Sequence, residues 1–316
     1  MRAVLIEDGK VGYGETTEPL LGDEEVLVQV TSAGINAADL LQVAGKYPPP
    51  PGVRSDIPGL EFAGTAIAQG SRVSDAFLGK RVMAIVGGAA QAEFVSVHHS
   101  QLIEVPTQVD LRDAGAIPEA FLTAYDALWA QGNLTFGYRV LINGASGGVG
   151  SAAIALSVAA GAVTFGTSRS PTGRRYIESL GATGLDPQGI TGAGPFDIVV
   201  ELVGGRNFHA TLAELRSRGT IVIIGVSDLA QTELNMRLVM TKRAIVRGST
   251  LRARSQSEKA ELTRTFSERV APYFSRGILK PQISMSYPAS EAPRAYSDFA
   301  NLPKTGKLVL QFSASA

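Results

Sequence analysis

The chain of 316 residues has no cysteine, only three histidines and a single tryptophan. Without cysteine it can form no disulfide framework, no iron–sulfur cluster and no thiolate ligand for zinc, and it has no cysteine nucleophile. An excess of either charge is also absent, because 29 Lys and Arg balance 29 Asp and Glu. A neutral chain has no long-range attraction for phosphate backbones or anionic membranes, which argues against nucleic acid and membrane partners. The missing cysteine favours an intracellular location, and we expect the cytoplasm.

A hydrophobic run that would target or anchor the chain is also missing. The first apolar run meets Glu7 and Asp8 and is too short for a signal peptide. Residues 140–168 carry no charge and could span a bilayer in length. Six glycines interrupt that stretch, and both of its ends resemble strands. We interpret it as a buried strand–helix–strand segment.

What the chain does contain is a large apolar fraction, 45%, and 35 glycines. This composition is typical of a folded protein with a sizeable core, and the length suggests about two domains. The first 110 residues predict short strands, and residues 46–56 predict a stiff surface loop with four consecutive prolines. Such a loop often borders a cleft. Helices are expected at 110–129 and 257–275, and a last strand at 306–312.

From about residue 139, predicted strands and helices alternate, which indicates an α/β fold with a doubly wound parallel sheet. The strands are expected at 139–143, 162–167, 196–203, 220–225 and 245–251. The helices between them are expected at 148–160, 172–180, 207–215 and 234–241.

A glycine-rich turn joins the first of these strands to its helix, in the sequence Gly144-Ala-Ser-Gly-Gly-Val-Gly150. A strict G-x-G-x-x-G would need glycine where Ala145 stands, so the motif alone is weak. Its position between a strand and a helix strengthens it, because glycines let the backbone approach a pyrophosphate at a helix N-terminus. The alternative is a tight turn without a ligand. We predict dinucleotide binding at Ala145, Ser146, Gly147, Gly148 and Val149.

The residues after the next strand favour NADPH over NADH. An NAD site usually carries an acidic residue about 20 positions after the glycines. Here no acidic residue follows Gly150 until Glu178, whereas Ser168 and Arg169 end the strand and Arg174 and Arg175 follow. Cations without a carboxylate suit a 2′-phosphate. Arg169 is the better candidate, because residues 174 and 175 could equally belong to a solvated helix face.

Two enzyme families with such a turn can be compared. Short-chain reductases place the turn near the N-terminus and use Tyr-x-x-x-Lys, and none of the eight tyrosines here has a lysine four residues later. The chain instead resembles the medium-chain dehydrogenase/reductase superfamily along nearly its whole length. The motifs that carry the resemblance are Gly34-Ile-Asn36-x-x-Asp39, Gly45-Lys-Tyr47, Pro58-Gly-Leu-Glu61-Phe-Ala-Gly64, Pro118-Glu-Ala-Phe-Leu-Thr123-Ala-Tyr125, Gly144–Gly150 and Gly306-Lys-Leu-Val-Leu310.

Within that superfamily the chain looks like the zinc-independent quinone oxidoreductase branch, related to zeta-crystallin, and especially the p53-inducible subgroup. Zinc relatives have a Cys where residues 33–39 fall and a Gly-His-Glu where Gly59-Leu60-Glu61 stands, so both metal ligands are replaced. The histidines, His98, His99 and His209, are interpreted as ordinary surface or core residues. The resemblance therefore implies no metal.

The resemblance also implies a fold and an activity. It implies a Rossmann dinucleotide-binding domain at 120–257 and a β-rich, GroES-like catalytic domain at 1–119 and 258–316. The activity would be metal-free, NADPH-dependent reduction of quinones by hydride transfer in the interdomain cleft. Alternatives are an NADPH-dependent reductase of conjugated alkenals or enones, and a non-catalytic NADPH-binding protein. Relatives pair the strand at 245–251 across a dimer axis, which implies a homodimer.

Individual roles come from the same resemblance. Tyr47 would contact the substrate carbonyl, and Asn36 and Thr123 would position the nicotinamide and its ribose. Asp39 is a catalytic candidate that could instead order its loop, and Glu61 is expected in a structural salt bridge. One departure concerns the 2′-phosphate, because the lysine and tyrosine that bind it in many relatives correspond to Gly173 and about Gln188. Either Arg169 and Arg174 take over this role, or the preference for NADPH is weak. Further cofactor contacts are expected at Val203, Gly225, Ser249 and Leu251.

Overall fold

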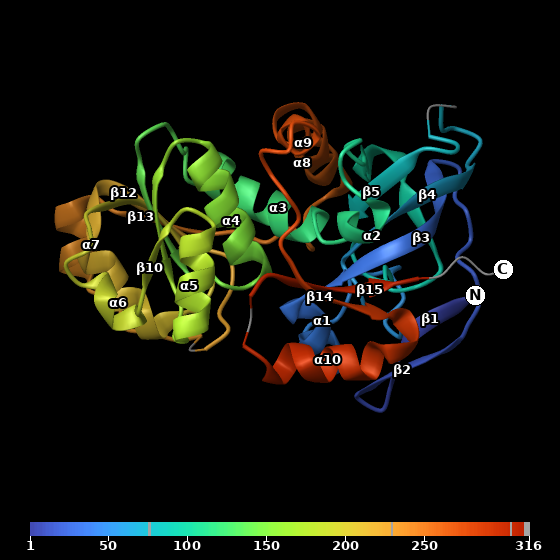
Figure 1. The fold of residues 1–316 in the computed structure, drawn as a ribbon, viewed down its shortest axis with the longest axis horizontal. Helices are drawn as coiled ribbons and strands as arrows, with labels where there is room; N and C mark the ends of the chain where they lie inside the picture. The colour runs from blue at the N-terminus through green and yellow to red at the C-terminus, as the bar shows by residue number, and fades with distance from the viewer. Residues whose placement is uncertain (75–76, 229, 304, 313–316) are drawn as a thin grey trace. The chain divides into compact units, whose positions relative to one another are not determined.

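The computed structural model describes residues 1–74, 77–228, 230–303 and 305–312, and the chain divides into two compact units (Figure 1). The first unit contains Met1–Leu122, Leu251–Leu302 and the chain from Lys307 onward, and the second contains Thr123–Thr250 and Pro303–Gly306. The sequence places the boundaries at 119/120 and 257/258 instead. The segment from Leu251 falls in the first unit because Arg252 is buried against the loop that carries Tyr47.

The second unit is built on a six-stranded sheet in the order β10-β9-β8-β11-β12-β13, and every neighbouring pair is parallel. Helices lie on both faces, α4 and α5 on one side and α6 and α7 on the other (Figure 1). The predicted doubly wound sheet is therefore confirmed. Its strands are β8 (Arg139–Asn143), β9 (Val163–Thr167), β10 (Thr183–Leu185), β11 (Phe196–Glu201), β12 (Leu215–Ile223) and β13 (Ile245–Gly248). Its helices are α4 (Gly148–Ala159), α5 (Pro171–Ser179), α6 (Gly205–Ala213), α7 (Met236–Lys242) and the short 3₁₀ turn η3 (Pro187–Ile190).

The first unit contains a mostly antiparallel seven-stranded sheet in the order β14-β15-β3-β4-β5-β7, with β6 paired to β3. On β3, Val26, Val28 and Val30 are buried and alternate with half-buried residues, as expected for a strand with one face in the core. The strands of this sheet are β3 (Glu25–Ile35), β4 (Glu61–Gln69), β5 (Arg81–Ile85), β6 (Phe94–His98), β7 (Leu102–Glu104), β14 (Ile283–Pro288) and β15 (Lys307–Gln311). A separate hairpin consists of β1 (Arg2–Glu7) and β2 (Lys10–Glu15).

The pairing of β15 with β3 brings the C-terminal strand beside the first long strand, with Leu308 opposite Ile35. Lys307 therefore lies next to the segment that enters α1 (Ala37–Val43), although 271 residues separate it from Asn36.

The single helix predicted at 110–129 is wrong, because the chain forms α2 (Leu111–Ala114), α3 (Pro118–Tyr125) and a π-helical segment η2 (Asp126–Gln131). Gly115 breaks the run where its amide donates to Ser32 Oγ over 3.0 Å, and a Cβ there would lie 2.6 Å from the Ser32 carbonyl oxygen. The helix predicted at 257–275 is likewise divided near Pro272. The remaining helical elements are α8 (Gln256–Arg269), α9 (Ala271–Ser275), α10 (Ala292–Asn301) and the 3₁₀ turns η1 (His99–Gln101) and η4 (Ala289–Glu291). None of the helices in the described ranges is both long and apolar enough to cross a membrane.

Candidate active site

The glycine turn of the second unit has the close packing that a dinucleotide turn requires. Gly144 has a φ of +78°, and a Cβ on Gly150 would lie 2.5 Å from the Gly144 carbonyl oxygen. By contrast, a Cβ on Gly147 would meet only the Gly144 oxygen, at 3.9 Å. Gly147 also caps α4 without a side-chain hydrogen bond. The helix N-terminus thus presents backbone amides beside open space, which suits a phosphate group.

A buried polar network holds this turn in place. Asn143 Nδ2 donates to Glu201 Oε2 over 2.6 Å, and Thr167 Oγ1 donates to Asn143 Oδ1 over 3.2 Å. Glu201 Oε1 in turn accepts the amides of Val203 and Gly204. Burial raises the pKa of Glu201, against the lowering effect of these donors. The carboxylate therefore organises the loop after β11 and would hold Val203 beside the turn, a role that the sequence motif did not indicate.

The two predicted phosphate-binding arginines differ in their surroundings. Arg174 Nη1 lies 3.0 Å from Asp186 Oδ2 and donates to the backbone carbonyls of Ser168 and Arg169. The side chain of Arg169 is exposed and forms no ion pair within 4 Å with another described residue, although its charge contributes to lowering the pKa of Asp228. Arg169 is thus the cation available to a ligand, whereas the guanidinium of Arg174 is engaged within the protein.

Other predicted cofactor residues are placed as follows. The Oγ1 of Thr123 is buried and has no hydrogen-bond partner among the described residues, so a ligand group could complete it. Ser249 Oγ donates to Asp126 Oδ2 over 2.5 Å, and the amide of Gly225 donates to the carbonyl of Glu201. Leu251 is buried and belongs to the first unit, whereas Thr123, Gly225 and Ser249 belong to the second.

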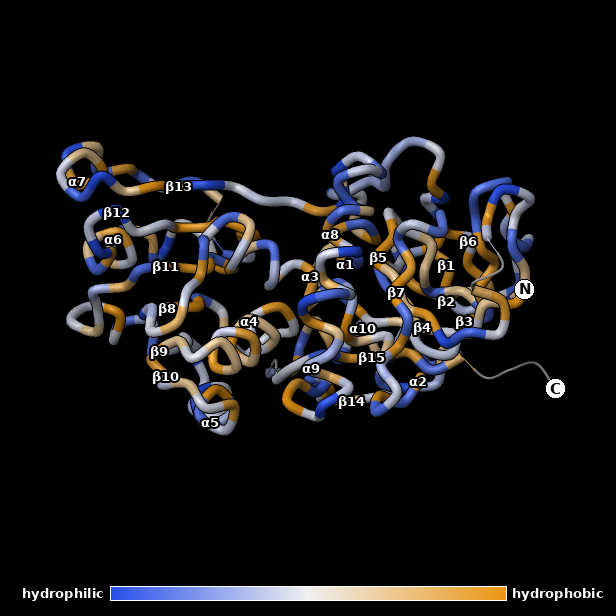
Figure 2. Tube along the Cα trace, turned by 90° about the horizontal axis from the view of Figure 1, so that it is seen from above, coloured by the Kyte–Doolittle hydropathy of each residue, from blue (hydrophilic) through white to orange (hydrophobic). Residues whose placement is uncertain are grey.

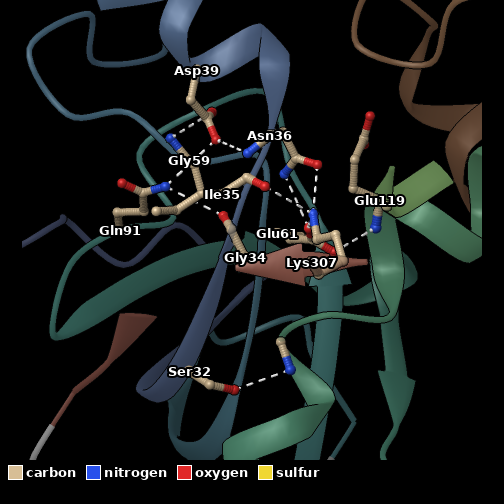
Figure 3. Close-up of polar contacts among 12 residues, drawn as sticks. Ser32, Gly34, Ile35, Asn36, Asp39, Gly59, Glu61, Gln91, Glu119 and Lys307 are labelled. Atoms are coloured by element: carbon tan, nitrogen blue, oxygen red, sulfur yellow. Dashed lines mark hydrogen bonds and ion pairs between the residues drawn. The ribbon is translucent and has the colours of Figure 1, made fainter. Parts of the chain in front are cut away.

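The first unit contains a buried ion pair between Lys307 and Glu61, whose side chains are 3% and 0% exposed (Figure 3). The Lys307 ammonium donates to Glu61 Oε1, to Asn36 Oδ1 over 2.6 Å and to the carbonyl of Ile35 over 3.2 Å. Asn36 Nδ2 also donates to Glu61 Oε1, over 3.0 Å. The expected structural salt bridge of Glu61 is confirmed, and Lys307 is the partner that the sequence did not identify.

Asp39 lies beside this pair and connects two backbone segments. Its Oδ2 accepts the amide of Asn36 over 2.8 Å, which closes the start of α1, and its Oδ1 accepts the amide of Gly59 over 3.1 Å. Gly59 has a φ of +108°, and a Cβ there would lie 2.6 Å from the Gln91 amide nitrogen. Burial raises the pKa of Asp39 to about 7, although the Asn36 amide and Lys307 lower it. These contacts support the alternative in which Asp39 orders its loop.

Glu119 at the start of α3 is the third carboxyl of this cluster. Its backbone amide donates to Glu61 Oε2 over 2.8 Å. Its side chain is half-buried, and Figure 3 shows the carboxyl group directed away from Lys307. Burial and then the Glu61 carboxylate raise the pKa of Glu119 to about 8, and Lys307 and Arg252 oppose them.

Tyr47 lies against a buried arginine that the sequence did not single out. The Arg252 guanidinium carbon is 4.7 Å from the centre of the Tyr47 ring, and Nη1 donates to the Tyr47 carbonyl over 2.9 Å. The same guanidinium donates to the carbonyl of Gly87 and to Gln42 Oε1. Arg252 is only 6% exposed. Arg252 therefore binds the proline-rich loop near its start, at Tyr47.

The donor set around Glu61 does not suit a divalent metal. No group of three or more His, Cys, Asp or Glu in the described ranges could hold one. Between the segment 33–39 and Glu61 lies the ammonium of Lys307, a cation that would repel another. His98 and His99 stack with ring centres 4.7 Å apart, because the strand β6 ends at His98 and η1 begins at His99.

Two known families match separate parts of the chain. Residues 22–107 match the alcohol dehydrogenase GroES-like domain, and residues 148–268 match the family described as zinc-binding dehydrogenase. The first match falls in the β-rich unit and confirms the predicted GroES-like domain. The second covers the glycine turn and the sheet that follows it.

Individual proteins are similar over most of the chain. Quinone oxidoreductase of Lama guanicoe is 29% identical over 306 residues, which is 92% of this chain and 90% of that protein. A quinone oxidoreductase-like protein 2 homolog of Nematostella vectensis is 28% identical over 303 residues, covering 92% and 82%. Among solved structures, the human synaptic vesicle membrane protein VAT-1 homolog-like protein has a TM-score of 0.85 at 26% identity, over 100% and 99% of the two chains.

Proposed function

Because the chain belongs to the medium-chain dehydrogenase/reductase superfamily, we propose that this oxidoreductase uses NADPH to reduce quinones by hydride transfer without a metal. When bound, the nicotinamide cofactor would supply the hydride. The observation that carries the metal-free part of the proposal is the Lys307 ammonium between Asn36 and Glu61. Without a Lewis acid, acceptors that take hydride readily, such as quinones, are favoured over ordinary ketones.

The residues of the chain would then bind and orient the cofactor and the substrate. The amides at the start of α4 would receive the pyrophosphate, with Ala145, Ser146 and Val149 around it. Thr123 Oγ1 offers an unused hydrogen-bonding group to the ribose or nicotinamide. Tyr47, held by Arg252, would contact the substrate carbonyl.

The experiment is an absorbance assay of nicotinamide oxidation with 1,4-benzoquinone, run in parallel with NADPH and NADH. We expect turnover with both the wild type and the Arg174→Ala variant, and a preference for NADPH. Binding of either cofactor without oxidation by quinones, but with reduction of a conjugated alkenal, would assign the enone reaction instead. Binding without any turnover would leave a nucleotide-binding role.

The cofactor preference has its own test. Arg169 is exposed and unpaired among the described residues, and so it is available to the 2′-phosphate. We expect Arg169→Ala to weaken NADPH binding about tenfold and to leave NADH binding within twofold, since only NADPH carries that phosphate. Equal losses for both cofactors would remove Arg169 from phosphate recognition.

We also propose a homodimer that forms through β13, which is an outer strand of its sheet. Ile245 and Val246 are each 39% exposed, and Met236 and Met240 of the neighbouring α7 are 77% and 70% exposed. Figure 2 shows apolar segments along both elements. An open strand edge with apolar side chains favours pairing with a second copy. Light scattering should give the mass of a dimer, and Ile245→Lys should shift it to a monomer.

A further inference from the structure

The polar network around Lys307 satisfies its own members almost completely. The ammonium of Lys307 has three acceptors, and Glu61 accepts from Lys307, from Asn36 Nδ2 and from the Glu119 amide. Both oxygens of Asp39 accept backbone amides. The exception is the carboxyl group of Glu119, which makes no hydrogen bond or ion pair with any other described residue. It is also half-buried, so it is the member of the cluster whose oxygens can reach a ligand.

We propose that Glu119 is the acid that delivers a proton to the substrate oxygen. This inference rests on the proposed reductase function and identifies a proton donor for it. A protonated carboxyl group whose O–H makes no hydrogen bond within the protein can donate its proton to a bound substrate. Glu119 also shares a neighbour with the substrate-side loop, because the Arg252 guanidinium that stacks on Tyr47 acts electrostatically on Glu119 as well.

The charges around Glu119 favour its neutral form. The groups that face it are Glu61 on β4, Asp39 on α1, Lys307 on β15 and Arg252 before α8. The two carboxyls and burial outweigh the two cations, and the pKa rises to about 8. The N-terminal turn of α3 opposes this effect, because the positive end of a helix favours a carboxylate. At neutral pH the carboxyl therefore keeps its proton, as a general acid must.

The step balances for a quinone acceptor. The quinone accepts a hydride, which carries two electrons and one proton, and becomes the hydroquinone monoanion while the cofactor is oxidised. The O–H bond of Glu119 then breaks, and an O–H bond forms on the anionic oxygen of the substrate. The resulting Glu119 carboxylate takes a proton from water before the next turnover.

The test compares Glu119→Gln with a matched control, Asp113→Asn. Glutamine has the same shape and leaves the Glu119 backbone amide free to bond Glu61. Asp113 is another carboxyl on a neighbouring helix with a raised pKa, caused by burial and Asp110, but it lies outside this cluster. For Glu119→Gln we expect kcat to fall about 100-fold with KM within threefold. The decline in kcat/KM of the wild type above about pH 8, and its solvent deuterium isotope effect, should both disappear. Asp113→Asn should keep both.

A second measurement needs neither cofactor nor turnover. The infrared C=O band of a protonated carboxylic acid should appear in the difference spectrum of wild type minus Glu119→Gln at pH 7, and it should be lost as pH rises through about 8. The subtraction removes the band of Asp39, whose pKa is about 7. If the glutamine variant does not fold, Glu119→Asp should keep the alkaline limb with a lower kcat.

The outcomes separate the two proposals. An active enzyme whose rate, pH profile and isotope effect are unchanged in Glu119→Gln overturns the role of Glu119 and leaves the reductase function standing. A Glu119 band already absent at pH 7 overturns it as well. A wild type that oxidises neither cofactor with any quinone or enone overturns the reductase function, whatever the infrared titration shows.

Discussion

The two candidate regions of this protein use opposite chemistry to organise a site. In the second unit, the turn at Gly144–Gly150 consists of small residues and offers backbone amides, so close packing decides its shape. In the first unit, side chains carry the site, and a buried ammonium binds Asn36 and Glu61. A backbone site depends on volume and a side-chain site on charge compensation. The two should therefore fail in different ways when altered.

The largest expected effect is loss of the buried cation. Lys307→Met would leave Glu61 without its counter-charge at 0% exposure, and we expect the free energy of unfolding to fall by about 3–5 kcal/mol. Urea denaturation measures it. The control is Lys80→Met, whose partner Glu104 is 62% exposed and whose own side chain is 40% exposed, so its loss should stay below about 1 kcal/mol. Equal losses for the two lysines would show that Lys307 is no more important than a surface ion pair.

The matching change in the other region adds volume. A Cβ on Gly150 would lie 2.5 Å from the Gly144 oxygen and 2.6 Å from the Ala145 Cα. Gly150→Val should therefore displace the start of α4, lower stability by about 1–3 kcal/mol and weaken cofactor binding more than tenfold, as measured by calorimetry. Gly189→Ala is the control, because its Cβ would meet only Leu185 Cδ2 at 4.0 Å. Unchanged binding in Gly150→Val would mean that the turn does not hold the cofactor.

The role of Arg252 can be tested through the loop that it fastens. Arg252→Met removes the hydrogen bonds to Tyr47, Gly87 and Gln42. Trypsin should then cleave the chain after Lys46, which is exposed, at least tenfold faster. If Tyr47 contacts substrate, KM should rise more than kcat falls. Arg276→Met, which removes an exposed arginine over the Tyr273 ring, should change neither quantity. Cleavage at the wild-type rate in Arg252→Met would contradict a positioning role.

The last prediction concerns the dependence of stability on pH. Glu119 has a pKa of about 8 in the folded protein, raised from the ordinary value of 4.5. Between these pH values the unfolded chain has lost the proton that the folded chain keeps, so rising pH favours unfolding. The stabilising contribution is full below about pH 4.5 and gone above about pH 8. The difference in unfolding free energy between wild type and Glu119→Gln should therefore decline over this range. A constant difference would show that Glu119 titrates alike in both states.

Several parts of this picture could be read from the sequence, because they depend on neighbouring residues. The strand Arg139–Asn143 and the helix after the glycine turn were predicted almost to the residue, since their pattern is local. The predicted helix at 110–129 failed because Gly115 packs on Ser32, a contact between distant segments. The glycine turn was predicted for the same reason as its strand, since the residues of one short segment build it.

The ion pair of Glu61 shows what could not be predicted from the sequence. The sequence indicated that Glu61 needs a cation, but it did not indicate which one, because Lys307 reaches it only through the pairing of β15 with β3. The roles of Arg252 and Glu119 could not be predicted either, because each depends on partners that are distant in the sequence. The sequence by itself determined the α/β class, the glycine turn and the missing thiolate ligands, since these follow from composition and local order. Only the tertiary structure decided which charges meet, because the free energy of a buried charge depends on its neighbours in space.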